Sequence, residues 1–343
     1  MIKPFAHSIG PSADNRASGR IKTEVIRLFP AEVSEVSAAP RPPARRTRFK
    51  SLTILPLTAL MVLVVGMPGV KESVMAPATD ATSLTVANSQ LEAAPSIPPL
   101  KRWSRMAADE QTAFVTEQAQ RISAMLGENP HPFSRAAVQA IRDYVDSYAR
   151  RSGSASEAPW EEGLRRVFDR AGRHAPTIVR AFRDRRVPAI IGLYLPMIES
   201  EYRTCLESPY GAKGLFQFMP GSARIYGVAA KDLCDIEKMA PAAAQYVADR
   251  MTEFGSDSKS MTLVLLSFNR SPAAVRRDLI QLRQQNPDLE RSFWMLFDHA
   301  DKLDSYFKQE SRNYVPKFFA AVIVGENPET FDLRMMPLSA QGE

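Results

Sequence analysis

The sequence predicts a mainly α-helical fold. From residue 108 onward, apolar side chains recur at helical spacing, and short stretches rich in Gly, Pro and Ser separate the helical segments. No segment combines alternating β-branched residues with hairpin turn signals, so a sheet has little to build on. The chain has 343 residues, 45% of them hydrophobic, and can therefore bury one substantial core.

The first 50 residues differ from the rest in charge. They hold ten Lys and Arg against four Asp and Glu, a net charge of +6, which equals the net charge of the whole chain. Residues 51–343 therefore carry 34 basic side chains (44 less 10) and 34 acidic ones (38 less 4). The basic pI describes this segment, which we expect to be a disordered cytoplasmic tail, and we expect no nucleic-acid partner.

An uncharged stretch of apolar character, residues 51–70, follows this basic tail. At ~1.5 Å rise per residue, a helix of this length crosses a hydrocarbon core of ~30 Å. Cations on its N-terminal side predict a single-pass anchor whose N-terminus stays in the cytoplasm. The alternative is a cleaved signal peptide, with small residues near Ala76 as the cleavage site. Residues 71–105, rich in Ala, Ser, Thr and Pro, are expected to be a flexible linker.

A helical extension is expected over residues 106–186, with Ser134 as one N-cap and a break near Pro176. Its predicted helices cover residues 108–126, 134–151, 160–173 and 175–185.

The segment VPAIIGLYLPMI, residues 187–198, is apolar all round, which for a helix means burial on every side. Pro196 would clash with the carbonyl of Gly192, so we expect a kink. Glu199 is then the first ionisable group at the end of this helix. Desolvation there would raise its pKa, as a general acid near neutral pH requires. The alternative is that Glu199 and Glu201 are surface acids at a helix end.

A Gly-rich loop, residues 208–220, comes next and suits close approach of a polymeric ligand. Cys205 and Cys234 flank this loop. Because export places the chain where disulfides persist, we expect them to pair, with two unrelated thiols as the alternative. The four histidines are scattered, and none is at ligand spacing to a cysteine, so no metal or other cofactor is expected.

In this order, the motifs resemble the lytic transglycosylase family of peptidoglycan-cleaving enzymes. Glu199-Ser200, the loop SPYGAKGLFQFMP and Tyr226-Gly227 match its Glu-Ser, Ser-x-x-Gly-Ala-x-Gly-Leu-x-Gln-x-x-Pro and Tyr-Gly patterns. Two later blocks, Ser267-Phe268-Asn269 and ESRNYVPK at 310–317, resemble its Ala-Tyr-Asn and Glu-Thr-x-x-Tyr-Val-x-Lys blocks. The sequences of the segments LPMIES and YVPKFFAA are most similar to the membrane-bound D-type branch.

The resemblance implies a lysozyme-like, goose-type helical catalytic domain, which we place at residues 187–330, with a tail at 331–343. It implies peptidoglycan glycan strands as the partner. It also places the anchor 51–70 in the inner membrane and the catalytic domain in the periplasm, with proteins of an envelope complex as further candidate partners.

The implied reaction cleaves the β-1,4 bond between MurNAc and GlcNAc with Glu199 as acid and then base. The C6 hydroxyl of the same MurNAc attacks C1 and leaves a 1,6-anhydro end. In contrast to the paired carboxylates of most glycosidases, one carboxyl suffices. We expect Glu201 to be a solvated bystander. By position match, the residues that bind or orient the glycan are Ser208, Gln217, Met219, Asn269 and Tyr314.

Two other functions stay open. A hydrolytic, lysozyme-type muramidase would need a second acid, for which Glu207 and Asp235 are near in sequence. A domain that binds peptidoglycan without cutting it could instead scaffold an envelope complex. Arg270-Ser271 keeps this second alternative open, because the family has a small residue and Gly there.

Overall fold

The structure, a computed structural model, describes residues 101–127 and 132–342. These residues are mainly helical and include no β-strand beyond isolated bridges, which confirms the predicted fold class. The expected tail 1–50, the expected anchor 51–70 and most of the expected linker 71–105 lie outside the described residues. Within the described ranges, no helix has the length and apolar character needed to cross a membrane.

Three helices precede the central one: α1 (Ala108–Leu126), α2 (Arg135–Arg150) and α3 (Leu164–Asp184). Ser134 caps α2 as predicted, because its Oγ accepts from the Ala137 N–H at 3.2 Å. The helix break expected near Pro176 is wrong, since α3 runs through this proline. Ala175 and Ile178 are both fully buried, so the apolar face continues across Pro176 and packing sustains the helix.

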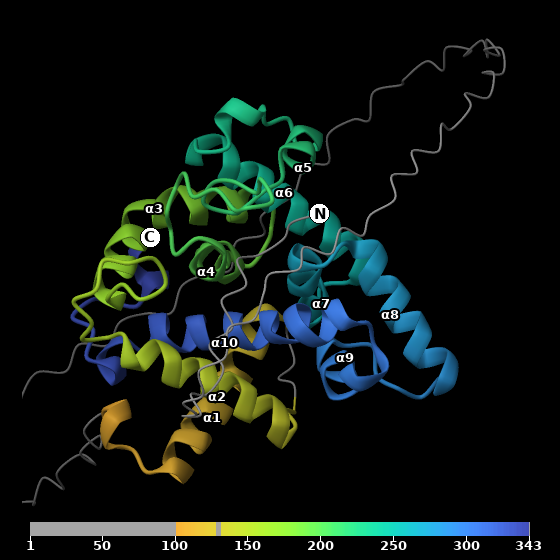
Figure 1. Cartoon of the computed structure of the whole chain (residues 1–343), viewed down its shortest axis with the longest axis horizontal. Coiled ribbons are helices and arrows are strands. Elements are labelled where there is room, and N and C mark those ends of the chain that lie inside the picture. Colours follow the sequence, from red (N-terminus) through yellow and green to blue (C-terminus); the bar gives the residue numbers. More distant parts are fainter. Residues whose placement is uncertain (1–100, 128–131, 343) are drawn as a thin grey trace, which may run out of the picture. The chain divides into compact units, whose positions relative to one another are not determined.

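The central helix, α4 (Ala189–Glu199), is buried at every position from 190 to 199. It packs against α3 and against α10 (Arg312–Glu326), and α10 also packs along α2. Figure 1 shows α4 in the middle of the described part, with α10 and α2 below it. Surrounding helices therefore exclude water from residues 190–199 of α4, including its last residue.

The chain between α4 and α10 forms α5 (Pro220–Ile225), α6 (Ile236–Phe254), α7 (Ser258–Asn269), α8 (Pro272–Gln285) and α9 (Phe293–Asp298). A π-helical turn, η4 (Phe307–Ser311), leads directly into α10. Single 3₁₀ turns complete the described part at η1 (Trp103–Arg105), η2 (Ala230–Asp232), η3 (Ala300–Lys302), η5 (Pro328–Phe331) and η6 (Leu338–Gln341).

Both ends of the described part pack on the helical core. Trp103, within the expected linker, is buried, and its ring centroid lies 5.6 Å from that of Phe331. Leu338, within the expected tail, is fully buried, and η6 packs against α3 and α4. These two ends are therefore part of the folded unit.

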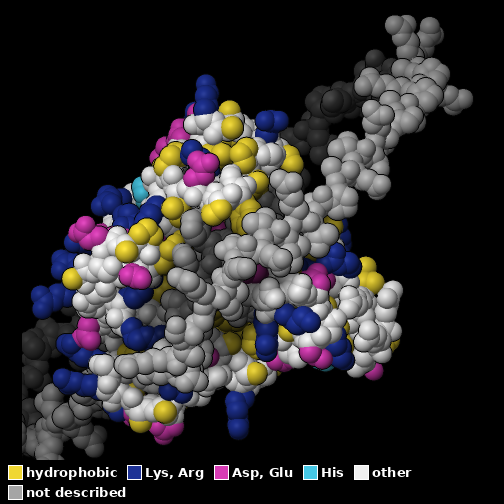
Figure 2. Space-filling view, viewed as in Figure 1, with side chains coloured by type: hydrophobic (Ala, Val, Ile, Leu, Met, Phe, Trp, Pro, Cys, Tyr) yellow, Lys and Arg dark blue, Asp and Glu magenta, His cyan; other side chains and the backbone are white. Residues whose placement is uncertain are grey.

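Charged side chains are interspersed on the surface. Figure 2 shows Lys and Arg side chains alternating with Asp and Glu over the visible face. This mixture of signs is what the equal numbers of basic and acidic side chains in residues 51–343 lead one to expect.

Gly192→Ala should destabilise the fold, because a Cβ there would lie 2.5 Å from the ring of Phe182, which is fully buried and has no room to move. We expect a loss of about 1–3 kcal/mol in the free energy of unfolding, measured by urea denaturation. Gly221→Ala in α5 is the matched control, since a Cβ at that position would have no atom within 4 Å. Equal stability of Gly192→Ala and wild type would contradict this close packing.

Candidate active site

Glu199 is the last residue of α4, and only 2% of it is exposed. The Tyr314 hydroxyl donates to Glu199 Oε1 at 2.5 Å, whereas Oε2 has no hydrogen-bond partner among the described residues. Burial raises the pKa of Glu199 to about 7, and the Tyr314 hydrogen bond and the Lys317 charge oppose the rise. Near neutral pH, the carboxyl can therefore both donate and accept a proton.

Two residues of α10 face this carboxyl. Tyr314 and Lys317 are three positions apart, so they lie on the same face of the helix. The Lys317 ammonium is 5.3 Å from the ring centroid of Trp160, within cation–π range. Desolvation lowers the pKa of Lys317, while the charges of Glu201 and Glu199 oppose this.

Asn269, at the end of α7, belongs to a polar group next to the same carboxyl. Its Oδ1 accepts from the Ser311 hydroxyl at 2.9 Å. Burial, followed by the charge of Glu310, raises the pKa of Tyr306 to about 12, and a hydrogen bond with Asn269 opposes the rise. The Glu199 charge also acts on Tyr306, so this group joins α7 to the start of α10 beside Glu199.

The loop after α4 is tied to the helix end, since the Ser200 hydroxyl donates to the Leu215 carbonyl at 2.7 Å. The Gln217 amide donates to the carbonyls of Leu206 and Gly214, both at 2.9 Å, and its Oε1 is buried without a partner among the described residues. The Ser208 hydroxyl accepts from the Ala212 N–H at 3.0 Å. Gln217 and Ser208 therefore fix the shape of the loop.

Met219, the N-cap of α5, is half-buried. Within the described part of the chain, no hydrogen bond joins Ser208, Gln217 or Met219 to Glu199. The structure thus brings Tyr314 into contact with Glu199 and Asn269 near it. The other three predicted binding residues lie along the loop.

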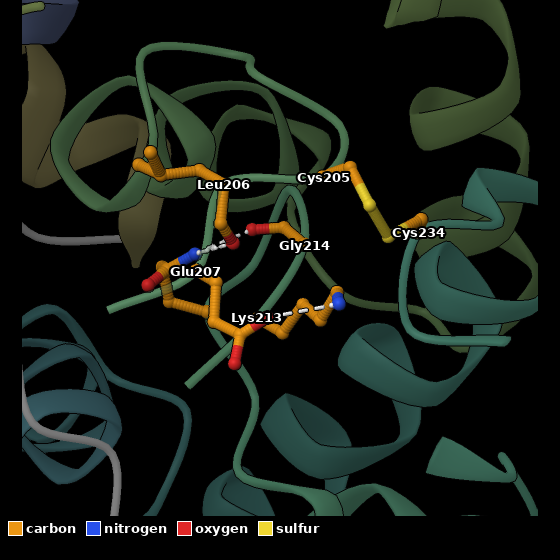
Figure 3. Close-up of a disulfide and its surroundings, with 7 residues drawn as sticks. Cys205, Leu206, Glu207, Lys213, Gly214 and Cys234 are labelled. Atoms are coloured by element: carbon orange, nitrogen blue, oxygen red, sulfur yellow. Dashed lines mark hydrogen bonds and ion pairs between the residues drawn. A yellow bond between two sulfur atoms is a disulfide. The ribbon is translucent and has the colours of Figure 1, made fainter. Parts of the chain in front are cut away.

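A disulfide joins Cys205 to Cys234, with their Cα atoms 4.7 Å apart, as Figure 3 shows. This confirms the predicted pair. Gly214 packs beside it at a φ of +85°, and a Cβ there would meet the carbonyl oxygen of Leu233 at 2.0 Å. Glycine is therefore required where the loop passes next to this disulfide.

The expectation that Glu201 is solvated is wrong, since only 1% of it is exposed. Its carboxylate pairs with Arg151 at 2.5 Å and with Arg203 at 3.2 Å. Glu201 has a φ of +50°, a left-handed conformation at the turn after α4. These arginines provide the partners that a buried carboxylate needs.

A second buried carboxylate, Glu162, extends this group. It pairs with Arg170 at 2.7 Å and with Arg203 at 2.8 Å. Arg170 also donates to the Glu201 carbonyl from Nε and from a terminal nitrogen, at 3.1 and 3.0 Å. The backbone that follows Glu199 is therefore held by α3 and by the segment before it.

Arg270 is 4% exposed and pairs with Asp278 at 2.7 Å and with Asp304 at 2.5 Å. The Ser271 hydroxyl caps α8 by accepting from the Ala274 N–H at 3.3 Å. This departure from the family pattern therefore joins α7, α8 and the segment that leads to α10.

Sequence reasoning missed Lys317, Tyr306 and the arginines that pair with Glu201. The spacing of Lys317 from Tyr314 was a usable signal, because it predicts a shared helix face. Arg203 is only two residues from Glu201 and could have been considered, whereas nothing local indicated Arg151, which is 50 residues away. No group of three or more His, Cys, Asp or Glu within the described ranges could hold a metal ion.

Residues 178–289 match the model of the transglycosylase SLT domain. This segment begins within α3 and ends after α8, so it contains Glu199, the loop and Asn269, but not Tyr314 or Lys317. No curated protein matches the chain.

Glu201→Gln should destabilise the protein strongly, because Arg151 and Arg203 would lose a buried counter-charge. We expect a loss of about 3–5 kcal/mol in the free energy of unfolding. Glu207→Gln is the control: its pair with Lys213 is exposed and should contribute less than about 1 kcal/mol. Urea denaturation of both variants measures this, and equal losses would contradict the assignment.

Glu199→Gln should change how stability depends on pH. The folded pKa of about 7 exceeds the ordinary value of 4.5, so the folded state binds the proton more tightly and wild type loses stability as pH rises through this window. The difference between these two pKa values predicts that wild type loses about 3 kcal/mol in the free energy of unfolding. Between pH 4 and pH 8, the free energy of unfolding of Glu199→Gln, measured by urea denaturation, should therefore rise by about that amount relative to wild type. A stability difference independent of pH would refute the raised pKa.

Proposed function

Because residues 178–289 match the model of the transglycosylase SLT domain, we propose that this protein is a lytic transglycosylase that cleaves peptidoglycan with Glu199 as its only catalytic carboxyl. One observation carries the assignment of this residue. Glu199 is a buried carboxyl with a pKa of about 7 and one oxygen without a partner among the described residues.

In the proposed reaction, protonated Glu199 donates its proton to the glycosidic oxygen, and the bond from this oxygen to C1 of MurNAc breaks. The C6 hydroxyl of the same sugar bonds to C1, and its proton passes to the Glu199 carboxylate. The products are a 1,6-anhydro-MurNAc end and a free GlcNAc 4-hydroxyl. No water is consumed, and Glu199 ends in its initial protonation state, so one acid serves both steps.

The surroundings of the other acids favour this reaction over hydrolysis, which would need a second carboxylate. Glu201 is committed to Arg151 and Arg203. Glu207 pairs with Lys213 at 2.9 Å, and Asp235 accepts from the Glu237 N–H at 3.0 Å as the cap of α6. Each candidate for a second acid therefore has a structural partner.

The contacts of the predicted binding residues support a different role for each of them. Tyr314 would hold Glu199 in place, and Asn269 would do the same through its bonds with Ser311 and Tyr306. Gln217 has only its Oε1 left as an acceptor for a sugar hydroxyl, since its amide is used within the loop. Ser208 and Met219 would contribute from the same loop.

Residues 51–70 would hold this domain at the inner membrane, facing the cell wall. The uncharged stretch after a basic tail is what supports the anchor. We also propose proteins of an envelope complex as binding partners.

Digestion of purified sacculi tests the function. Wild type should release muropeptides with anhydro ends, lighter by one water than hydrolysed ends when measured by mass spectrometry. Glu199→Gln should lose at least about 100-fold of the rate, because it can neither donate nor accept the proton. Glu207→Gln is the matched control and should keep the wild-type rate.

Other results would select the alternatives. Hydrolysed, reducing ends from wild type would indicate a muramidase. A wild-type protein that pellets with sacculi and releases nothing would indicate a binding scaffold. Release by Glu199→Gln at the wild-type rate would refute the assignment of Glu199.

A further inference from the structure

We propose that Lys317 is a positioning residue that stabilises the carboxylate of Glu199 between its two proton transfers. This inference deepens the proposed function and rests on it. Lys317 lies in α10, outside the residues that match the SLT domain.

Helix geometry places Lys317 beside the reacting group. Tyr314 contacts Glu199 directly at 2.5 Å. Lys317 follows by three positions in the same helix, and side chains at this spacing are neighbours on one face. The ammonium is therefore on the face of α10 that contacts the end of α4.

Trp160 fixes where the ammonium can sit. Its ring centroid is 5.3 Å from Lys317 Nζ. Trp160 lies between α2 and α3 with a φ of +67°, a left-handed conformation that is costly for a bulky residue. Arg151 donates to the Glu162 carbonyl at 3.0 and 2.8 Å and so closes this loop. A held aromatic face favours the charged ammonium at this place.

No anion among the described residues pairs directly with the Lys317 ammonium. Within the described residues, Lys317 makes no hydrogen bond and no ion pair shorter than 4.0 Å. The charged groups that act on it are, from the largest influence to the smallest, Glu201 after α4, Glu199 at the end of α4, Arg151 after α2 and Glu310 in η4. Arg151 and Arg203 already pair with Glu201.

This arrangement suits the charge that the reaction creates. While Glu199 is protonated, Lys317 faces a neutral carboxyl. When the proton passes to the glycosidic oxygen, a carboxylate forms in a desolvated place, where an opposite charge acts more strongly than in water. Lys317 would stabilise that state until the C6 hydroxyl returns a proton.

Two Lys317 substitutions test the charge in the full-length protein. Lys317→Met removes it, and Lys317→Arg keeps it. The control is Lys308→Met, which removes an exposed lysine from η4. Titration of ¹³C-labelled glutamate carboxyls by NMR, with Glu199→Gln to assign the signal, measures the pKa of Glu199 without any substrate.

We expect Lys317→Met to raise this pKa by about one pH unit, because the ammonium favours the charged carboxylate. The alkaline limb of the pH–rate profile on sacculi should move up by the same amount, and the maximal rate should fall about tenfold. Lys317→Arg and Lys308→Met should leave the pKa of Glu199 unchanged.

An unchanged pKa of Glu199 in Lys317→Met overturns the inference, whatever its activity. A purely structural role would lower the melting temperature and the rate without moving the alkaline limb. If Lys317→Met does not fold, Lys317→Gln replaces it with the same expected shift. Failure of the proposed function looks different, because wild type would then release no anhydro products while the NMR titration could still be read.

Discussion

Burial of one carboxyl at the end of an apolar helix is the constraint on which this structure depends. Removing a carboxyl from water disfavours its charged form, and packing of α3 and α10 around α4 imposes that cost on Glu199. Tyr314 offsets part of the cost through a single hydrogen bond. Further donors to the carboxylate would lower the pKa and leave too little of the acid form near neutral pH, so an incomplete set of partners is what the proposed chemistry requires.

Glu201 shows how the same residue type behaves when its partners are complete. Both carboxyls are buried, and they are two residues apart. Glu201, however, turns through a left-handed conformation toward Arg151 and Arg203. Its carboxylate pairs with two guanidinium groups, whereas desolvation is the largest influence on the pKa of Glu199 and raises it. The environment therefore divides the two acids into a structural anion and a candidate proton carrier.

Features set by nearby residues could be predicted from the sequence. The all-round apolar segment predicted the burial of α4 and of Glu199, Ser134 predicted a cap, and the two cysteines, on the expectation of export, predicted the disulfide. Predictions from the sequence were wrong where packing between segments determines the structure. Pro176 lies inside α3 because an apolar face continues across it. The pairing of Glu201 with Arg151 joins residues 50 positions apart, which no local pattern reports.

The segment that matches the SLT domain contains Glu199, but residues outside it set the surroundings of this carboxyl. Tyr314 and Lys317 come from α10, beyond residue 289, and Trp160 and Arg151 precede residue 178. Each acts on Glu199 directly or on a group that does. A domain cut at the limits of the match would keep the carboxyl and lose the hydrogen bond and the cation that oppose its raised pKa. Residues before position 178 and in α10 are therefore part of the environment of Glu199, and the pKa of this carboxyl depends on Tyr314 and Lys317.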